Sequence, residues 1–381
     1  FGIPRDLGIL AVSNCIWGFG EGLFIFFYPL SLQRWNIDSL QIGAVLSFLG
    51  VAMAVVQAPA GYLSDRFGAR PLIRAAFILG VIAAIMMAAA TSLPFFIAGL
   101  VVYSLTSFIV APLNSYVTQM RGDWSAQRAI SFMSGSMQLG AILGPTLGGE
   151  IAQTAGLPTV FRYSAGLFLI ATVIFFFARR PAAQQNAAQA AEEGGPSRAS
   201  LWTNPRFMGL LVIIFLTIVG LSTPQQLTSV YLKDVHQLSF QQIGMTGTFA
   251  GIGTATILFA LGNMPTAAGM VAGQLFLGVF SLFMWRGQSA AVFYAGYLFI
   301  GGYRLYHAMA VAAVRPLVNA SSVGLAYGLV ETVNALAVIL APLVAGALYR
   351  YQAQAVYTAS LGYLAVTAAI TLVWYLRSAR T

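Results

Sequence analysis

The chain has 381 residues, of which 59% are hydrophobic and only 8% are charged, and its mean hydropathy is +0.80. In soluble globular domains about a quarter of the residues are charged. The present composition therefore excludes a soluble domain and predicts an integral membrane protein. A single cysteine, Cys15, excludes an internal disulfide, and two histidines without a Cys/His cluster leave no zinc-binding spacing. We therefore expect no metal and no cofactor.

Windows of about 20 apolar residues predict twelve spanning helices. The first segment is too long for a signal-peptide core and has no cleavage pattern, so we expect it to remain as a spanning helix. The predicted ranges are Leu7–Leu30, Gln41–Leu63, Pro71–Ala90, Pro94–Tyr116, Ala129–Gln153, Thr159–Phe177, Phe207–Leu232, Gln242–Leu261, Ala267–Trp285, Ala290–Val311, Gly324–Leu348 and Val356–Leu376.

The segment from Arg179 to Pro205 is an extended polar, low-complexity stretch. It cannot bury enough apolar area to fold alone, so we interpret it as a flexible linker. The sequence thus predicts an all-α integral membrane protein with two pseudo-symmetric six-helix bundles, residues 1–180 and 206–381, joined by a cytoplasmic linker at 181–205.

Two short sequences recur in the two halves, in the same order. The tetrapeptide LQIG at 40–43 returns as QQIG at 241–244, and ILGPTLGG at 142–149 returns as ILAPLVAG at 339–346. Two repeats with nearly the same offset indicate duplicated halves, and we expect the interface between them, near the bilayer midplane, to hold a substrate.

Basic residues are distributed unequally between the two membrane faces. With the loop after the second helix placed inside, 13 of the 19 arginines and lysines are cytoplasmic, and Arg304 lies within a helix. The outer side receives Arg34, Arg162, Lys233, Arg286 and Arg350. This bias predicts that both termini are cytoplasmic. We expect the protein to lie in a bacterial or archaeal cytoplasmic membrane. Because the arginines set topology, no nucleic-acid function follows from the net charge of +9.

The loop after the second predicted helix reads GYLSDRFGARPLIR and is densely charged. Its spacing G-x-L-S-D-R-x-G-x-R resembles motif A of the major facilitator superfamily of transporters. Gly61 would allow close helix approach and Gly68 would supply the turn. The resemblance implies that Asp65, beside Arg66 or Arg70, forms a lock between the halves on the cytoplasmic side. The alternative is a basic loop that only retains topology.

The fifth predicted helix carries small residues at helical spacing: Gly140, Gly144, Pro145, Gly148 and Gly149. This pattern resembles motif C, the antiporter motif of the drug/proton antiporter branch of that superfamily. Small residues leave a groove for another helix, and the proline permits a bend. The resemblance implies a helix at the interface of the halves whose bend is associated with export. The alternative is generic small-residue packing.

Two features depart from that branch. Ser131 stands where the motif has its leading glycine, and the fourth-helix segment Ile97–Ala111 lacks the intramembrane arginine that branch members usually carry. Any proton-relay role of that arginine must therefore be absent here or be carried by another residue.

Glu21 lies in the middle of the first predicted helix, among three glycines and close to Trp17. A central charge costs about 2.5–3.5 kcal/mol on insertion scales, so an acid at this depth is a functional candidate. Desolvation favours its protonated form, which would let it exchange a proton for a substrate. First-helix acids act in this way in several exporters of the family it resembles. The alternative is a hydrogen-bonded carboxyl that fixes packing.

Arg304 is the one base well inside an apolar helix, and Tyr303 and His307 accompany it. Arginine cannot lose its charge, so it must face an acid, a water-filled cavity or an anionic substrate, unless it lies near a helix end and extends to the interface. Glu21 and Glu331 are its predicted intramembrane partners. His307 is a candidate proton carrier, with packing as the alternative.

Other polar residues complete the set of candidates. Glu331 is a candidate for coupling, whereas Glu150 is expected at the interface. Gln225 and Gln226, in the seventh helix, could hydrogen-bond a substrate. Trp17 and Tyr303, with other aromatic residues, would suit a lipophilic or cationic ligand.

These features together predict a secondary active transporter of small molecules that works by alternating access. The favoured interpretation is proton-coupled export of lipophilic or drug-like compounds by a monomer, with protons as the coupling ion and no enzymatic activity. Uptake or exchange of an organic anion such as a carboxylate, phosphate or lysolipid, bound by Arg304, is the alternative. A non-transporting membrane sensor or enzyme is the remote alternative; no paired carboxylates or activated nucleophile are found that would indicate an enzyme.

Overall fold

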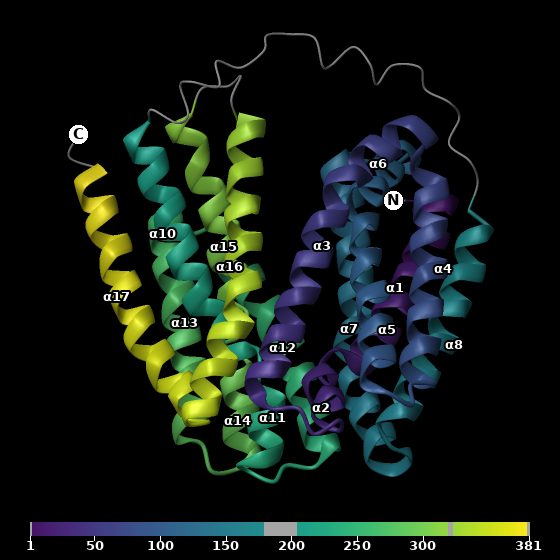
Figure 1. Ribbon diagram of the computed structural model, residues 1–381. Coiled ribbons are helices and arrows are strands. Elements are labelled where there is room, and N and C mark those ends of the chain that lie inside the picture. The colour runs from purple at the N-terminus through teal and green to yellow at the C-terminus, as the bar shows by residue number, and fades with distance from the viewer. Residues whose placement is uncertain (1, 179–203, 319–322, 379–381) are drawn as a thin grey trace. The chain divides into compact units, whose positions relative to one another are not determined.

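The computed structural model describes residues 2–178, 204–318 and 323–378, and Figure 1 shows their arrangement into helices. Within these ranges every regular element is helical, so the predicted all-α class is confirmed. The predicted linker falls almost entirely on 179–203, outside the described residues, and the division into two six-helix bundles stays a prediction.

The helices follow the predicted segments in order. In the first half they are α1 (Arg5–Ile25), α2 (Tyr28–Gln33), α3 (Ser39–Phe67), α4 (Ala69–Ala88), α5 (Leu93–Leu105), η1 (Thr106–Ile109), α6 (Val110–Met120), α7 (Ala126–Ala155) and α8 (Leu157–Phe176). In the second half they are α10 (Pro205–Ser222), η3 (Thr223–Gln225), α11 (Thr228–Asp234), α12 (Phe240–Leu261), α13 (Thr266–Arg286), α14 (Ala290–Tyr297), α15 (Gly302–Val314), η4 (Arg315–Leu317), α16 (Val323–Tyr351) and α17 (Ala355–Ser378).

Ten helical stretches in the described residues are long and apolar enough to cross a membrane. The two further predicted spans correspond to α7, which is long but rich in glycine, serine and threonine, and to α14–α15, which is interrupted at residues 298–301. With these two, the described helices accommodate all twelve predicted spans.

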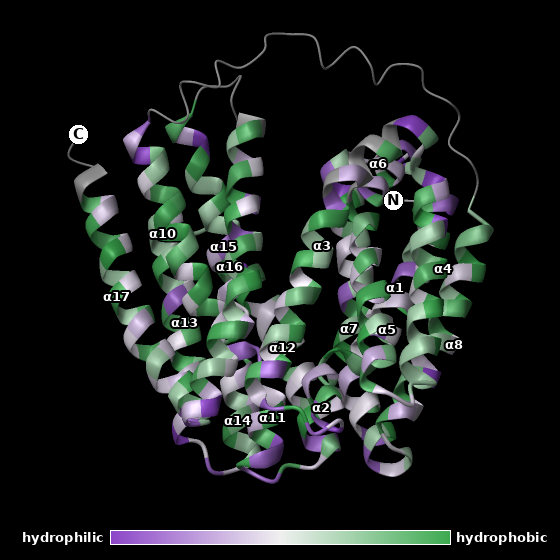
Figure 2. Cartoon of the chain, in the orientation of Figure 1, coloured by the Kyte–Doolittle hydropathy of each residue, from purple (hydrophilic) through white to green (hydrophobic). Residues whose placement is uncertain are grey.

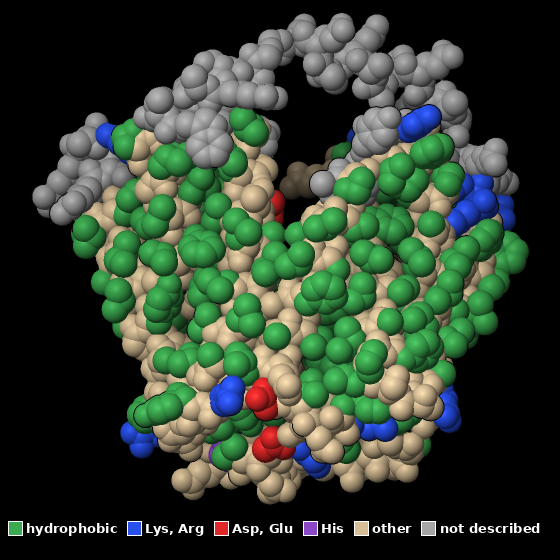
Figure 3. Space-filling view, viewed as in Figure 1, with side chains coloured by type: hydrophobic (Ala, Val, Ile, Leu, Met, Phe, Trp, Pro, Cys, Tyr) green, Lys and Arg blue, Asp and Glu red, His purple; other side chains and the backbone are tan. Residues whose placement is uncertain are grey.

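Large apolar side chains lie exposed along the helices, as a lipid environment requires. Phe259 is 95% exposed and Phe177 is 72% exposed. Figure 2 shows hydrophobic residues along most of each helix, and on the face drawn in Figure 3 hydrophobic side chains cover the helix flanks while most charged side chains lie toward the helix ends. The charge pattern is that of a membrane protein.

The chain forms two compact units. Unit 1 comprises the described residues within Phe1–Ile37, Phe48–Gln184 and Leu232–Thr248, and unit 2 those within Asp38–Ser47, Gln185–Tyr231 and Phe249–Thr381. Within unit 1, α1 packs on α7 and α8, and α4 packs on α8 and α5. Within unit 2, α10 packs on α16 and α17, and α13 packs on α17, α14 and α15. The same helix pairs, counted from the start of each half, therefore meet in both.

Each unit also includes a short segment from the other half of the sequence. In unit 1, the first turns of α12 pack on α7: the Thr248 hydroxyl donates to the Ile142 carbonyl at 2.7 Å, and the Phe240 amide donates to Gln153 Oε1 at 3.1 Å. In unit 2, the start of α3 packs on α16, where the Ser39 hydroxyl donates to a carbonyl. Both contacts involve the repeated sequences.

Four spanning segments are broken into two helical pieces: α1–α2, α5–α6, α10–α11 and α14–α15. They are the first and fourth spans of each half. Broken helices in membranes expose backbone and side-chain polar groups, and such places commonly form substrate sites. The residues beside these four breaks are therefore candidates for binding substrate.

Candidate functional site

The loop that resembles motif A joins α3 to α4. Gly68 has φ of 81°, a backbone conformation that favours glycine, and it begins α4. The Arg70 guanidinium donates to the carbonyl of Ala178, and Arg66 lies over the ring of Phe67 at 5.4 Å. Arg70 thus ties the loop to the end of the first half of the chain, whereas the contact of Arg66 stays within the loop.

The remaining motif A residues, Gly61 and Asp65, have side chains outside the described set. The lock formed by Asp65 stays a prediction.

The glycines of α7 bring its backbone directly against α1. A β-carbon at Gly140 would overlap the carbonyl oxygen of Cys15, and one at Gly148 would overlap that of Leu23. A β-carbon at Gly144, between them, would be 2.7 Å from the backbone of Gly22 in α1. Because this contact brackets the middle of α1, α7 fixes the position of the helix turn that carries Glu21.

Pro145 and Gly149 lie on a second face of α7. A β-carbon at Gly149 would be 2.5 Å from the carbonyl oxygen of Phe240, at the start of α12. The hydroxyls of Thr146 and Thr248 are hydrogen-bonded at 2.8 Å on the same side. The small residues of α7 therefore contact two other helices, α1 and α12, and the sequence did not indicate that these two would be its partners.

Glu21 is half-buried in α1, and it has polar neighbours on two other helices. The Tyr103 hydroxyl, on α5, forms a hydrogen bond with the Glu21 carboxyl, and Tyr28 on α2 is close enough to interact with it electrostatically. The hydroxyl of Tyr28 is buried and has no hydrogen-bond partner in the described part of the chain. A carboxyl and two phenols thus converge where α1–α2 and α5–α6 are broken.

Aromatic rings surround this polar group. The Phe24 ring centroid lies 5.2 Å from those of both Tyr28 and Tyr103, and Tyr103 is stacked with Phe168 at 6.0 Å. A carboxyl in such a setting is partly shielded from water, and it can hold a proton or face an organic cation. These residues form the unit 1 site: Glu21, Phe24, Tyr28, Tyr103 and Phe168.

Trp17 is only 7% exposed, one helix turn before Glu21. Its ring is stacked on Phe168 at 4.1 Å and tilted against Phe77 at 4.7 Å, and a β-carbon at Gly80 would overlap it. In this structure Trp17 packs α1 against α4 and α8, and it supports the ring that lines the unit 1 site.

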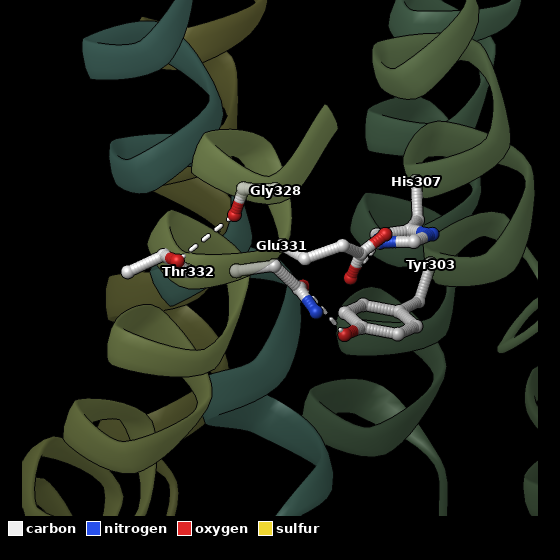
Figure 4. Close-up of polar contacts among 6 residues, drawn as sticks. Tyr303, His307, Gly328, Glu331 and Thr332 are labelled. Atoms are coloured by element: carbon white, nitrogen blue, oxygen red, sulfur yellow. Dashed lines mark hydrogen bonds and ion pairs between the residues drawn. The ribbon is translucent and has the colours of Figure 1, made fainter. Parts of the chain in front are cut away.

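In unit 2, four side chains of α15 and α16 form a polar cluster, drawn in Figure 4. His307 Nε2 lies 3.2 Å from Oε1 and 3.3 Å from Oε2 of Glu331. The Tyr303 hydroxyl donates to Asn334 Oδ1 at 3.1 Å, and the Tyr303 ring is nearly parallel to the His307 imidazole, with centroids 6.5 Å apart. We call these residues the unit 2 cluster.

Asn334 is a member that the sequence analysis missed. The signal that could have found it is its spacing of three residues from Glu331, which places both on one face of α16.

Arg304 neighbours this cluster without joining it. It is exposed, and among the described residues it forms no hydrogen bond or ion pair, although its charge acts on Tyr303. The carboxylate of Glu331 is paired with His307 instead. Glu21 belongs to unit 1, so a pair between Glu21 and Arg304 stays a prediction.

Gln225 and Gln226 lie at the break between α10 and α11 and are half-buried. Gln225 donates its amide to the Leu221 carbonyl at 2.7 Å, and Gln226 donates to the Ser222 carbonyl at 3.2 Å. Both side-chain amides thereby supply hydrogen-bond donors to the last carbonyls of α10, which lack helical partners where the regular helix ends. Glu150 is exposed near the end of α7.

Comparison with known proteins agrees with this architecture. The Major Facilitator Superfamily model matches residues 10–266. The multi-drug resistance efflux pump PmrA of Streptococcus pneumoniae is 21% identical over 83% of this chain and 80% of its own. The chain spans less than half the length of the first curated relatives it matches.

Solved structures show the same fold. The nucleoside transporter NupG superposes with a TM-score of 0.83 at 15% identity, over 97% of this chain and 99% of that one. The human organic anion transporter MFSD10 gives 0.66 at 18% identity, over 97% and 100%. Since the family model covers residues 10–266, about two thirds of the chain, the protein belongs to the major facilitator superfamily of membrane transporters.

Proposed function

We propose that this transporter exports small lipophilic or drug-like compounds in exchange for protons, and that Glu21 is its principal proton-binding group. The observation that carries this proposal is the hydrogen bond between Glu21 and Tyr103, within a wall of aromatic rings, at the point where two spanning segments are broken. A carboxyl in this setting can alternate between a bound proton and a bound substrate.

The relatives give independent support for drug export. PmrA is a multi-drug efflux pump by name, and it aligns along most of both chains. The close contact of α7 with α1 adds to this, because a helix that packs directly behind Glu21 can transmit the occupancy of that residue to the bend at Pro145.

The remaining features of the proposal follow from the sequence. The excess of basic residues on one face supports cytoplasmic termini, and a bacterial or archaeal cytoplasmic membrane fits this orientation. The two bundles, 1–180 and 206–381, would then alternate around a central site, with Asp65 as the cytoplasmic lock and a monomer as the working form.

Flux in proteoliposomes tests this proposal. With an imposed pH gradient, ethidium or tetracycline should accumulate against its concentration gradient, and Glu21→Gln should abolish that accumulation. Glu150→Gln is the matched control, because it makes the same change at an exposed glutamate and should leave flux unchanged. Flux that is independent of the gradient, or undiminished in Glu21→Gln, would contradict the proposal.

Transport of an organic anion is the second candidate, and Arg304 favours it. Its guanidinium is exposed beside Tyr303 and has no partner among the described residues, so it can bind a carboxylate or phosphate by donating hydrogen bonds to it. The fold it shares with the organic anion transporter MFSD10 is compatible with this. If only a fluorescent organic anion moves in the same vesicles, and Arg304→Ala abolishes its movement while Glu21→Gln does not, this candidate replaces export.

A further inference from the structure

The sequence repeats relate a pair of residues in unit 1 to a pair in unit 2. The tetrapeptide LQIG at 40–43 and its copy at 241–244 align Glu21 with Ser222. The same alignment places Tyr303 within one residue of the counterpart of Tyr103. Each pair thus joins the first and fourth spans of its half, and all four residues lie beside the breaks in those spans. Breaks of this kind commonly form substrate sites.

The tyrosine makes a similar contact in both units. In unit 1 the Tyr103 hydroxyl is hydrogen-bonded to the Glu21 carboxyl. In unit 2 the Tyr303 hydroxyl donates to Asn334 Oδ1 at 3.1 Å, and it is close enough to the Ser222 hydroxyl to interact with it. Figure 4 shows the Tyr303 ring directed from α15 toward α16. An acid in unit 1 therefore corresponds to a hydroxyl and an amide in unit 2.

Ser222, Tyr303 and Asn334, which we call the neutral trio, have hydrogen-bonding capacity that the described part of the chain does not use. The Ser222 side chain is 3% exposed, and its hydroxyl has no hydrogen-bond partner there. Asn334 accepts from Tyr303, but its own amide N–H groups form no hydrogen bond with a described residue. Polar groups shielded from water without partners cost free energy, so a ligand that supplies partners is favoured.

Gln225 adds an acceptor beside the neutral trio. It lies in η3, three residues after Ser222, and η3 packs on α16, the helix that carries Asn334. Its amide nitrogen donates to the Leu221 carbonyl at 2.7 Å, which leaves its Oε1 without a partner among the described residues. The side chains of Gln225, Tyr303 and Asn334 are only half-buried, so a small molecule can reach them. A donor and an acceptor together match the oxygen and the N–H of a carboxamide.

The charged residues nearby do not turn the trio into a second cation site. Glu331, one helix turn before Asn334, is already paired with His307 at 3.2 Å. Arg304 follows Tyr303 in the chain and is exposed, and its charge acts on that tyrosine. A positive charge at this place favours the oxygen of a ligand and disfavours a cation. The trio is therefore suited to a neutral, oxygen-bearing group.

We propose that Ser222, Tyr303 and Asn334 form a substrate subsite in unit 2 that binds a carboxamide group of the transported compound. The substrate class is then a lipophilic cation that also carries a carboxamide. A site built to hydrogen-bond a polar group discriminates against an analogue that lacks this group. The inference rests on the proposed function, because it assigns a further chemical group to the same substrate.

Two probes of nearly equal size test the subsite. Carbamoylmethyl-triphenylphosphonium carries a carboxamide, and isobutyl-triphenylphosphonium has methyl groups in place of the amide oxygen and nitrogen. Their dissociation constants are measured by calorimetry on the protein in detergent, where no proton gradient exists. Asn334→Leu should weaken binding of the carboxamide probe about 3–10-fold, as expected for loss of a neutral hydrogen bond, and leave the isobutyl probe unchanged. Asn263→Leu, at an exposed asparagine between α12 and α13, is the matched control and should affect neither probe.

Tyr303→Phe is the second variant, because it keeps the ring and removes only the hydroxyl that holds Asn334. It should also weaken the carboxamide probe alone, whereas Glu21→Gln should weaken both probes alike. Equal effects on the two probes in Asn334→Leu and Tyr303→Phe, or no effect on either probe, would overturn the subsite and leave drug export standing. If the variants distinguish the probes but no proton-driven flux is found in vesicles, the subsite stands and only the proposed coupling fails.

Discussion

Gly244 of α12 lies against Pro145 of α7 so closely that a β-carbon on the glycine would overlap the proline carbonyl oxygen. The same relationship recurs in unit 2, where Gly43 of α3 lies against the carbonyl oxygen of Pro342 in α16. The two sequence repeats of the chain are therefore contact partners: each repeated glycine packs on a repeated proline segment from the other half of the sequence.

Substitution at these crossings should destabilise the protein. Gly43→Ala or Gly244→Ala places a methyl group on a backbone oxygen, and overpacking of this kind costs about 1–3 kcal/mol. Thermal unfolding in detergent should show a lower midpoint for each. The control is Gly328→Ala in α16, where nothing lies within 4 Å, and where alanine should be neutral or about 0.5–1 kcal/mol stabilising. Equal midpoints for Gly43→Ala and Gly328→Ala would contradict the crossing.

The hydrogen bond between Glu21 and Tyr103 should appear as an energetic coupling. Tyr103→Phe removes the hydroxyl and keeps the ring that is stacked on Phe168, so it should weaken substrate binding less than Glu21→Gln. In a double-mutant cycle on the dissociation constant of a transported dye, the two changes should be non-additive by about 0.5–3 kcal/mol. Strictly additive effects would mean that the bond does not contribute to binding.

A buried polar contact should stabilise unit 2. The Gln274 amide donates to Thr371 at 3.1 Å and accepts from Thr367 at 2.9 Å, and it joins α13 to α17. Interhelical hydrogen bonds in membranes contribute about 0.6 kcal/mol on average and up to about 1.7 kcal/mol, so Gln274→Leu should cost about 1–2 kcal/mol. Gln119→Leu, at an exposed glutamine whose side chain bonds within α6, should leave the unfolding midpoint nearly unchanged.

The loop between α11 and α12 should give the stability of the protein a pH dependence. Burial lowers the pKa of the His236 imidazole below its ordinary value of 6.5, so the folded protein favours the neutral ring. The unfolded chain binds the proton more readily, and stability from this residue should fall as the pH drops below about 6.5. His236→Gln should flatten the fall in unfolding midpoint between about pH 7.5 and pH 5.5. Parallel curves for the two proteins would contradict this.

The sequence alone determined the membrane character, the twelve spans and the family resemblance. These are local properties: a spanning helix needs about 20 consecutive apolar residues, and the spacing of glycines and arginines in the α3–α4 loop is contained in a single stretch. The sequence also indicated Glu21, His307 and Glu331 as candidates, because an ionisable side chain in an apolar segment costs free energy to place in the membrane and is therefore rare there.

Only the tertiary structure decided which of these residues meet. Glu331 is paired with His307 although the sequence offered Arg304 as its partner, and Trp17 packs in a core although its position beside Glu21 suggested a ligand site. Each pairing depends on the rotation of one helix against another, which apolar periodicity cannot define when lipid and neighbouring helices are equally apolar. Side-chain contacts between helices, such as Tyr303 with Asn334, set that rotation, and they exist only once the helices have packed.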